Sequence, residues 1–357
     1  MSTKKYKIVK SKSIVYNGRT LYRIRALRDF NTVTGETVFK GDLGGFIETE
    51  NNLSQEGYCW IFNNAKVYDD ARVSEDAKIC GGAEIFDSAE VFGNAEISGN
   101  TQIFYGAHVC GNAKVYGYAK VCGKARVYGE AKVYNFAKIL DNAQVYDNAK
   151  IYENTIVAGD VQIYHNAQVY GNAWIYDDAF ICDNARIYGL AKIFNKAIVY
   201  GNAKVYGNAQ IFGKAKVYGN AEVYENAEIF DYAFIFGDAK VFSNAKIFGT
   251  TWLYCAAKIG DKLSLNKGKY IFATLNIDET LSEIEPICYK ISFAVRVIEL
   301  KLPIEQGYIE SLVSQFAEYN KLADSFCGQI YLSSEEKEIL AMLSQCKEDV
   351  KILKKAK

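Results

Sequence analysis

Residues 199–216 read VYGNAKVYGNAQIFGKAK, three copies of a six-residue unit that continues from Ile61 to Lys258 without insertion or deletion. This stretch holds 198 residues, or 33 units. The first place of each unit is Val or Ile, apart from Leu253 in the last unit. The fifth place is Ala in all but four units, which carry the small residues Thr101, Thr155, Val161 and Thr251. A strict period of six excludes an amphipathic α-helix, whose period is 3.6.

Each unit predicts a short strand followed by a turn. Residues 113–116 (Ala, Lys, Val, Tyr) alternate between small or aliphatic side chains facing inward and polar or aromatic side chains facing outward, the period of a half-buried strand. The fourth place is Asn, Asp or Gly in 22 of the 33 units, so we expect this place to adopt the left-handed backbone conformation. Hexapeptide periodicity of this kind is typical of the parallel β-helix.

The units resemble those of the left-handed β-helix proteins of the hexapeptide-repeat class, in which an aliphatic residue is followed four places later by Ser, Thr, Ala or Val. The resemblance implies three strands and 18 residues per coil, hence 11 coils, with left-handed winding. Strands paired about 4.8 Å apart then give a rod about 50 Å long. The expected fold is mainly β: a single-stranded left-handed parallel β-helix with an N-terminal β cap and a C-terminal α+β segment.

We predict three domains, at residues 1–58, 59–260 and 261–357. In the first, Tyr6–Val9, Ser13–Tyr16 and Leu21–Leu27 alternate like strands, and Asn17-Gly18 is a hairpin signal. In the last, Gly268–Ile277 and Ile287–Leu302 suggest strands. Apolar residues on one face predict two helices there, one carrying Ile304, Tyr308, Ile309, Leu312, Val313 and Phe316, the other Ile339, Leu340, Leu343, Val350 and Leu353.

The N-terminal segment resembles a narrower group. Residues 41–47 read GDLGGFI, which is similar to the segment that precedes the rod in bacterial and phage hexapeptide-repeat proteins, often labelled acyltransferases. We interpret this glycine-rich segment as a turn that caps the first coil. A phosphate-binding loop would require a helix directly after it, and the sequence predicts none.

Composition indicates a cytoplasmic protein without bound cofactor. The 357 residues carry no net charge, the N-terminus lacks an apolar signal segment, and no run of about 18 apolar residues occurs. We therefore expect neither a membrane nor a nucleic acid partner. The nine cysteines form no C-x-x-C pair, and those of the rod (Cys80, Cys110, Cys122, Cys182) never occupy neighbouring coils of one column. Disulfides and a metal site are not expected.

Catalysis would depend on two histidines. Acyltransferases of the resembling class use a histidine as general base, in a cleft between subunits that a loop interrupting the helix helps to form. The only histidines here are His108 and His165, which we expect on different sides of the rod and three coils apart, and no loop interrupts the repeat. We interpret both as surface residues and assign no catalytic residue, although an interface could bring other groups to either histidine.

Outward side chains differ between the three faces. One face combines a basic column with a tyrosine column, and we predict that it binds a partner. We call it the Lys/Tyr face: Lys114, Tyr116, Lys132, Tyr134, Lys150, Tyr152, Tyr170, Arg186, Tyr188, Lys204 and Tyr206. Stacked lysines repel one another. Either nearby turn carboxylates (Asp141, Asp147, Glu153) or an acidic partner could compensate them.

A second face carries Trp174, Tyr176, Phe194, Phe212, Phe230 and Phe248. The third becomes apolar in both columns towards its C-terminal end. We call this end the apolar face: Phe180, Ile198, Tyr200, Tyr218, Phe234, Phe236, Trp252 and Tyr254. Large apolar patches are seldom left bare. We therefore expect either residues 262–357 or another copy of the chain to cover it, as in the trimers of the resembling family.

Three functions remain open at this point. The first is a non-catalytic β-helical scaffold that presents a rigid aromatic and basic face to a protein partner. The second is the acyltransferase activity that the resemblance implies. The third is sequestration of a small anionic ligand such as a nucleotide, held by basic and aromatic groups together. Neither the identity of the partner nor the oligomeric state follows from these patterns.

Overall fold

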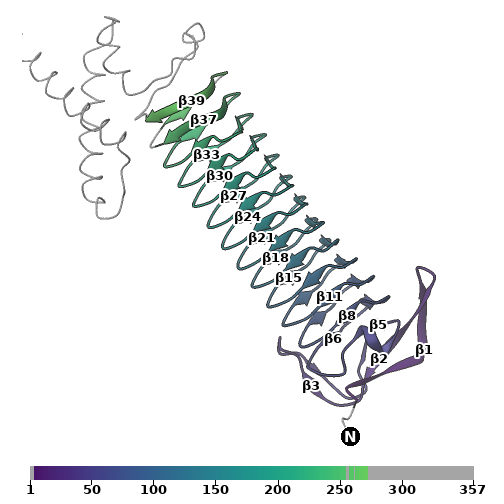
Figure 1. Cartoon of the computed structure of the whole chain (residues 1–357). Coiled ribbons are helices and arrows are strands. Elements are labelled where there is room, and N and C mark those ends of the chain that lie inside the picture. Colours follow the sequence, from purple (N-terminus) through teal and green to yellow (C-terminus); the bar gives the residue numbers. More distant parts are fainter. Residues whose placement is uncertain (1–3, 255–256, 261, 272–357) are drawn as a thin grey trace, which may run out of the picture.

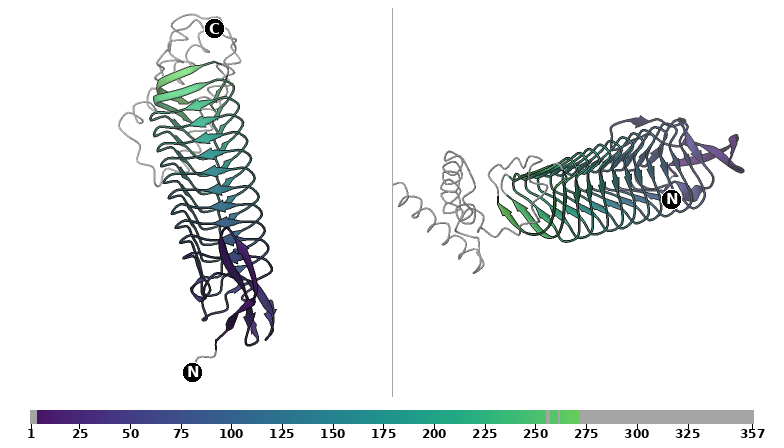
Figure 2. Two further views of the ribbon diagram at one scale, coloured as in Figure 1. Left: turned by 90° about the vertical axis from the view of Figure 1, so that its right-hand side faces the viewer. Right: turned by 90° about the horizontal axis from the view of Figure 1, so that it is seen from above.

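The computed structural model describes residues 4–254, 257–260 and 262–271. Within these residues the chain forms a parallel β-solenoid with a small antiparallel sheet at its N-terminal end (Figure 1). Two further views show that the solenoid is an elongated rod with the N-terminal strands at one end (Figure 2). The one helical element of the described part is the 3-10 turn η1 (Glu50–Asn52). No described helix has the length and apolar character needed to cross a membrane.

Each coil contributes one two-residue strand to each of three stacks, and strands 18 residues apart pair in parallel. The first stack comprises β6 (Trp60–Ile61), β9 (Lys78–Ile79), β12 (Glu96–Ile97), β15 (Lys114–Val115), β18 (Lys132–Val133), β21 (Lys150–Ile151), β24 (Gln168–Val169), β27 (Arg186–Ile187), β30 (Lys204–Val205), β33 (Glu222–Val223), β36 (Lys240–Val241) and β38 (Lys258–Ile259).

The second stack comprises β7 (Lys66–Val67), β10 (Glu84–Ile85), β13 (Gln102–Ile103), β16 (Lys120–Val121), β19 (Lys138–Ile139), β22 (Ile156–Val157), β25 (Trp174–Ile175), β28 (Lys192–Ile193), β31 (Gln210–Ile211) and β34 (Glu228–Ile229). The third comprises β8 (Arg72–Val73), β11 (Glu90–Val91), β14 (His108–Val109), β17 (Arg126–Val127), β20 (Gln144–Val145), β23 (Gln162–Ile163), β26 (Phe180–Ile181), β29 (Ile198–Val199), β32 (Lys216–Val217) and β35 (Phe234–Ile235). At the far end, β37 (Lys246–Tyr254) continues both stacks and pairs in parallel with β39 (Ser264–Ile271).

The core is a column of aliphatic and small side chains. From coil to coil the first-place Val or Ile and the fifth-place Ala are almost completely buried. Three fifth-place threonines are buried as well, and each hydroxyl donates to the carbonyl three residues earlier: Thr101 to Ser98, Thr155 to Tyr152 and Thr251 to Phe248, at 2.7–2.8 Å. A buried hydroxyl is tolerated when it has a hydrogen-bond partner, which explains why Thr can replace Ala here.

Hydrogen bonds between coils hold the backbone. Strand and turn amides donate to carbonyls of the next coil, as in Lys114 to Ala131 (2.9 Å), Tyr116 to Val133 (3.0 Å) and Tyr118 to Asn135 (2.7 Å). An extra residue within a strand or turn would shift the donors that follow it away from their acceptors, unless the residue looped out at a corner. The absence of insertions over 33 units therefore keeps these hydrogen bonds continuous along the rod.

The left-handed residue of each turn is at the third place of the unit, so its predicted position at the fourth place is wrong. Positive φ values occur at Asn63, Asp69, Glu75 and Gly81, and recur at six-residue intervals to Gly249. A Cβ added to Gly117 would lie 2.9 Å from the amide nitrogen of Asn135, so this turn packs closely on the next. Gly and Asn occur at both turn places, and composition alone did not separate them.

Turn side chains also link the coils. Third-place carboxylates accept the backbone N–H of the third-place residue 18 positions later, as Glu75 does from Gly93 (2.9 Å) and Glu153 from Gly171 (2.8 Å). Fourth-place asparagines form side-chain ladders, as in Asn184 to Asn202 (3.2 Å) and Asn202 to Asn220 (3.1 Å). These bonds explain why acidic residues and Asn recur at the corners.

The N-terminal cap consists of β1 (Tyr6–Tyr16), β2 (Arg19–Ala26) and β5 (Leu43–Ile47), with a small ribbon of β3 (Phe30–Asn31) and β4 (Thr37–Val38). The predicted hairpin at Asn17-Gly18 is confirmed, with positive φ at both residues, while the two predicted strands before it are one strand with a bulge. β5 pairs in parallel with β7, which joins the cap to the first coil.

The Gly44-Gly45 pair lets β5 approach the rod closely. A Cβ on Gly45 would lie 2.4 Å from Ile61 Cγ2 and 2.6 Å from the carbonyl oxygen of Ala65. Lys5, just before β1, is fully buried, and its amine donates to the carbonyl oxygens of Glu56, Gly57 and Cys59 at 3.0–3.3 Å. Both features support the interpretation of this segment as a cap for the first coil.

The predicted β class and parallel solenoid are confirmed. The first stack holds twelve strands, one more than the 11 predicted coils, because β38 continues the pairing beyond the last predicted coil. The strand predicted at Gly268–Ile277 begins earlier, at Ser264. The rest of the predicted C-terminal α+β segment lies outside the described residues.

Removing one whole coil should leave the rod folded. Deleting Val145–Gln162 keeps every later residue in its own stack, and each coil contacts only its neighbours. We expect the melting temperature, followed by circular dichroism, to fall by about 5 °C or less.

A six-residue deletion, Val145–Lys150, serves as the comparison. It preserves the inward and outward alternation but moves all later residues by one stack, which places Ile156 and Ala158 next to Lys132 and Tyr134. We expect a clearly larger loss of melting temperature, because the ring stacking and the ladders of the corners are broken. Equal melting temperatures for the two deletions would contradict the view that side-chain columns stabilise the rod.

Candidate functional site

The Lys/Tyr face lies entirely on the first stack, where its residues form two parallel columns. β15, β18, β21, β27 and β30 supply the basic column, and the tyrosines follow each strand by one residue. Register pairing places Lys114 beside Lys132 and Lys132 beside Lys150. Because the sixth and second places both point outward, each of these coils adds one cation and one ring to the same flat surface, whereas β24 supplies Gln168 in place of a cation.

An unbroken ladder of eight aromatic rings runs along this face. Its members are Tyr116, Tyr134, Tyr152, Tyr170, Tyr188, Tyr206, Tyr224 and Phe242, with successive centroids 4.8–5.4 Å apart and planes within 10° of parallel. The coil spacing dictates these distances. Such ring contacts add to the stability of neighbouring coils, and the rings stay half-exposed, which leaves one edge of each available to a partner.

Acidic residues neutralise the two ends of the basic column. Glu96 pairs with Lys114 at 2.6 Å, and Glu222 pairs with Lys204 at 3.0 Å and with Lys240 at 3.2 Å. Desolvation alone would raise the pKa of Glu222, but the hydrogen bonds from both lysines lower it overall. Between these ends, Lys132, Lys150 and Arg186 form no ion pair within the described residues.

The turn carboxylates do not form ion pairs with these cations. Asp141, Asp147 and Glu153 each accept the backbone N–H of the residue 18 positions later, at 3.1, 3.3 and 2.8 Å, and within the part of the chain described they pair with neither Lys132 nor Lys150. Local compensation by direct contact is therefore not what the structure shows. The middle of the Lys/Tyr face remains a cationic surface.

Three exposed apolar residues at the corner between the first and second stacks were missed by the sequence reasoning. Tyr118, Phe136 and Leu190 are 54%, 56% and 54% exposed, and Tyr118 and Phe136 stack with centroids 5.2 Å apart. They occupy the fourth place of the unit, where Asn, Asp or Gly is usual. That departure from the repeat was the available signal, but only the flat faces were compared.

The apolar face lies on the third stack, as predicted from its columns. Tyr200, Tyr218 and Phe236 stack with centroids 4.7–4.9 Å apart, and Phe234 lies 5.0 Å from Trp252. These side chains are half-buried by one another, so the surface is less bare than two apolar columns suggest. The residues expected to cover it, 262–357, lie mostly outside the described part, and whether they do remains a prediction.

His108 lies on the third stack and His165 at the corner that follows the same stack, so the expectation of different sides is wrong. His108 is in β14, and His165 is in the turn after β23, three coils further along the third stack. His108 Nδ1 is 4.0 Å from Glu90, whereas His165 Nδ1 is 2.9 Å from Asp183. Three coils separate them by about 14 Å, so they cannot act on one atom.

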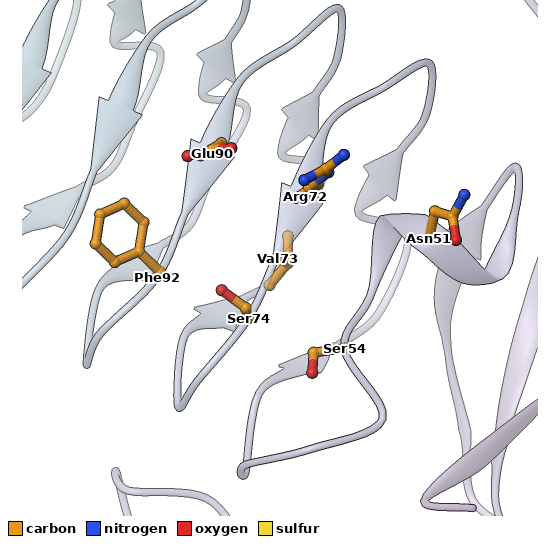
Figure 3. Close-up of a pocket in the computed structure, with 7 residues that line it drawn as sticks. All are labelled: Asn51, Ser54, Arg72, Val73, Ser74, Glu90 and Phe92. Atoms are coloured by element: carbon orange, nitrogen blue, oxygen red, sulfur yellow. The ribbon is translucent and has the colours of Figure 1, made fainter.

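A shallow pocket of about 390 Å³ lies beside His108, where the third stack meets η1 (Figure 3). Its lining comprises Asn51, Ser54, Arg72, Val73, Ser74, Glu90 and Phe92. In Figure 3, Arg72 and Glu90 lie on neighbouring strands, with Asn51 at one end and Phe92 at the other. Glu90 and Phe92 both contact His108, the ring of Phe92 edge-on with centroids 6.5 Å apart. The pocket thus combines both charges with small hydroxyl side chains.

No metal site is present among the described residues, because no group of three or more His, Cys, Asp or Glu side chains could hold an ion there. The described cysteines are free: Cys59, Cys80, Cys110, Cys122 and Cys182. Comparison with known proteins adds no assignment, since neither a family model nor a curated protein matches the chain.

The tyrosine ladder should make stability fall at alkaline pH. Burial raises the pKa of Tyr134 and raises the pKa values of Tyr152 and Tyr206 to about 12. The folded chain therefore keeps these protons when the unfolded chain has lost them. Their contribution to stability is complete below the ordinary tyrosine pKa of about 10 and is lost as the pH rises towards 12.

We expect the melting temperature of the triple variant Tyr134→Phe, Tyr152→Phe and Tyr206→Phe to fall less than that of the wild type as the pH rises from 9 to 12. Phe242 already continues the ladder, so the variant should remain folded. The replacement of Tyr58, Tyr105 and Tyr232 by Phe, all exposed and outside the ladder, controls for the loss of three hydroxyl groups. A triple ladder variant with the wild-type pH dependence would show that the ladder does not carry the effect.

Proposed function

We propose that this protein is a non-catalytic β-helical scaffold whose Lys/Tyr face binds an acidic surface of a protein partner. The observation that carries the proposal is the set of cations without ion pairs beside a rigid ladder of tyrosines: Lys132 and Lys150 on adjacent coils, and Arg186 two coils beyond Lys150. Like charges held about one strand spacing apart repel, and an acidic partner would relieve that repulsion.

Tyrosines suit such a contact because they supply a large area with little loss of side-chain freedom on binding. Here neighbouring rings hold each tyrosine in place before the partner arrives. The β-solenoid keeps the columns straight over several coils, so the partner meets a preorganised surface. The resemblance to the bacterial and phage hexapeptide-repeat proteins is part of this proposal, as is the left-handed winding that it implies.

A small-molecule function is the second candidate, supported by the pocket near His108. Glu90 and Phe92 both line the pocket and contact His108, so a ligand there would lie close to an imidazole. An acyltransferase of the resembling class would use such a histidine as a base. A thermal-shift panel separates the candidates: acyl-CoA would stabilise an enzyme, nucleotides would stabilise a sequestering protein, and a scaffold would respond to neither.

The Lys/Tyr face is tested with a fluorescent poly-glutamate peptide in an anisotropy titration. We expect the variant Lys132→Gln and Lys150→Gln to bind this probe about tenfold more weakly at low salt, with a flatter dependence on salt concentration. Adding Tyr134→Ser, Tyr152→Ser and Tyr170→Ser should weaken binding further. Melting temperatures of all variants verify that they are folded.

Lys196→Gln and Lys214→Gln provide the matched control. These lysines are exposed at the corner between the second and third stacks, opposite the Lys/Tyr face, and their removal changes the net charge equally. The control variant should bind the probe as the wild type does. If both pairs of substitutions weaken binding to the same extent, attraction depends on overall charge and the proposed face is wrong.

A further inference from the structure

The three exposed apolar residues at the corner between the first and second stacks are always flanked by cations. In each coil, four outward side chains follow one another around this corner. The first lies in a strand of the first stack, the second directly follows that strand, the third occupies the corner, and the fourth lies in a strand of the second stack. The three rows concerned are Lys114, Tyr116, Tyr118 and Lys120; Lys132, Tyr134, Phe136 and Lys138; and Arg186, Tyr188, Leu190 and Lys192.

Other rows of the corner lack this combination. Eight further rows carry Asn or Gly at the corner, and only the row from Lys240 to Lys246 is basic at both ends. An apolar corner therefore coincides with basic residues on both flanks in all three cases. Strand stability does not require this coincidence, because Asn ladders serve the corner equally well, as Asn154 and Asn172 show at 3.2 Å.

The flanking cations are available for binding. Lys120, Lys138, Arg186 and Lys192 are exposed, and within the described residues none of them forms an ion pair. Lys192 lies over the ring of Trp174 at 6.0 Å, which orients the chain without neutralising it. Lys120 and Lys138 are register partners, so the second stack carries its own pair of adjacent like charges.

The corner is convex, and its apolar residues follow the rod axis. Tyr118 and Phe136 are on adjacent coils, and Leu190 is three coils beyond Phe136, about 14 Å away. Apolar corner residues with basic flanks therefore occupy two adjacent coils and a third coil beyond them, and the two intervening coils carry Asn154 and Asn172 at the corner. A convex apolar line fits a groove, and cations on both flanks fit carboxylates on both lips of that groove.

We propose that this corner, which we call the basic–aromatic corner (residues 114–120, 132–138 and 186–192), inserts into an apolar groove of a folded protein partner whose two lips carry Asp and Glu side chains. The inference rests on the proposed function and deepens it, because it extends the binding surface around the corner and specifies the shape of the partner. Tyr118 and Phe136 are the anchors, since stacked aromatic side chains lose little freedom on burial.

Photo-crosslinking in the cells that naturally make the protein tests the proposal. The full chain carries p-benzoylphenylalanine in place of Phe136, and a matched chain carries it in place of Tyr232. Tyr232 is 53% exposed and also occupies the fourth place of its unit, but at the corner between the second and third stacks. We expect a protein adduct at position 136 in clear excess over position 232, with the crosslinked site in an apolar groove bordered on both sides by carboxylates.

Equal adducts at the two positions, an adduct with nucleic acid, an adduct with a second copy of this chain, or a crosslinked site without carboxylates would each overturn the proposal. A partner identified in this way is then titrated against purified variants. Tyr118→Asn with Phe136→Asn restores the usual corner residue of other coils, so the fold is retained, and we expect at least about tenfold weaker binding. Lys120→Gln with Lys138→Gln should weaken binding and flatten its salt dependence.

The two proposals fail in different ways. If poly-glutamate binding depends on Lys132 and Lys150 while position 136 gives no excess adduct, the Lys/Tyr face stands and the groove partner is wrong. If position 136 gives the expected adduct but poly-glutamate binding ignores Lys132 and Lys150, the corner stands without the flat face. Unchanged affinity of the Tyr118→Asn and Phe136→Asn variant for the adduct partner would remove the anchors.

Discussion

The rod depends on the hydrogen bonds that join every coil to the next. The strand and turn amides of each coil donate hydrogen bonds to carbonyls of the following coil, so a change in the length of a strand or turn would break some of those bonds. The same constraint aligns every outward residue with its equivalent 18 positions away. Columns of tyrosines, lysines, carboxylates and asparagines follow from this alignment, and each then adds contacts of its own.

Because the six-residue period is so strict, most outward residues form regular columns, and a residue that departs from its column is easy to recognise. When Asn recurs at a corner, its side chains form a ladder, and no partner is needed to explain them. Residues that leave the pattern need a separate reason. Phe136 and Leu190 expose apolar surface in place of Asn and form no ladder hydrogen bond, although Phe136 stacks on Tyr118. Departures from the repeat are therefore more informative about binding than the repeat itself.

Much of the fold could be predicted from the period alone. Burial of the first and fifth places follows from alternation, and the parallel stacks follow from a repeat too short for any other β arrangement. The left-handed turn residue could not be placed, because Gly and Asn suit both turn positions and only the path of the backbone distinguishes them. The ion pairs of Glu222 with two lysines likewise depend on how far each side chain extends, which the sequence pattern does not specify.

The candidate site was only partly accessible to the same reasoning. Counting in steps of 18 residues placed Lys132 and Tyr134 on one face correctly, since residues 18 positions apart are register partners on neighbouring coils. It assigned His165 to a different side of the rod from His108, although the turn that holds His165 follows the same stack. It overlooked Tyr118, because only the flat faces were compared. Corners join two faces, and a residue there has neighbours on both.

The cap formed by β1, β2 and β5 also affects whether the rod can associate end to end with other copies of the protein. A parallel stack ends in a row of unsatisfied amides and carbonyls, which can accept a further strand from any source. The pairing of β5 with β7 occupies that row in the second stack, and the buried amine of Lys5 donates to carbonyl oxygens just before the first strand of the first stack. A rod that lost this end would become a template for fibre growth, with each molecule serving as the next coil of another. The cap thus blocks the addition of a further strand at the N-terminal end of the rod.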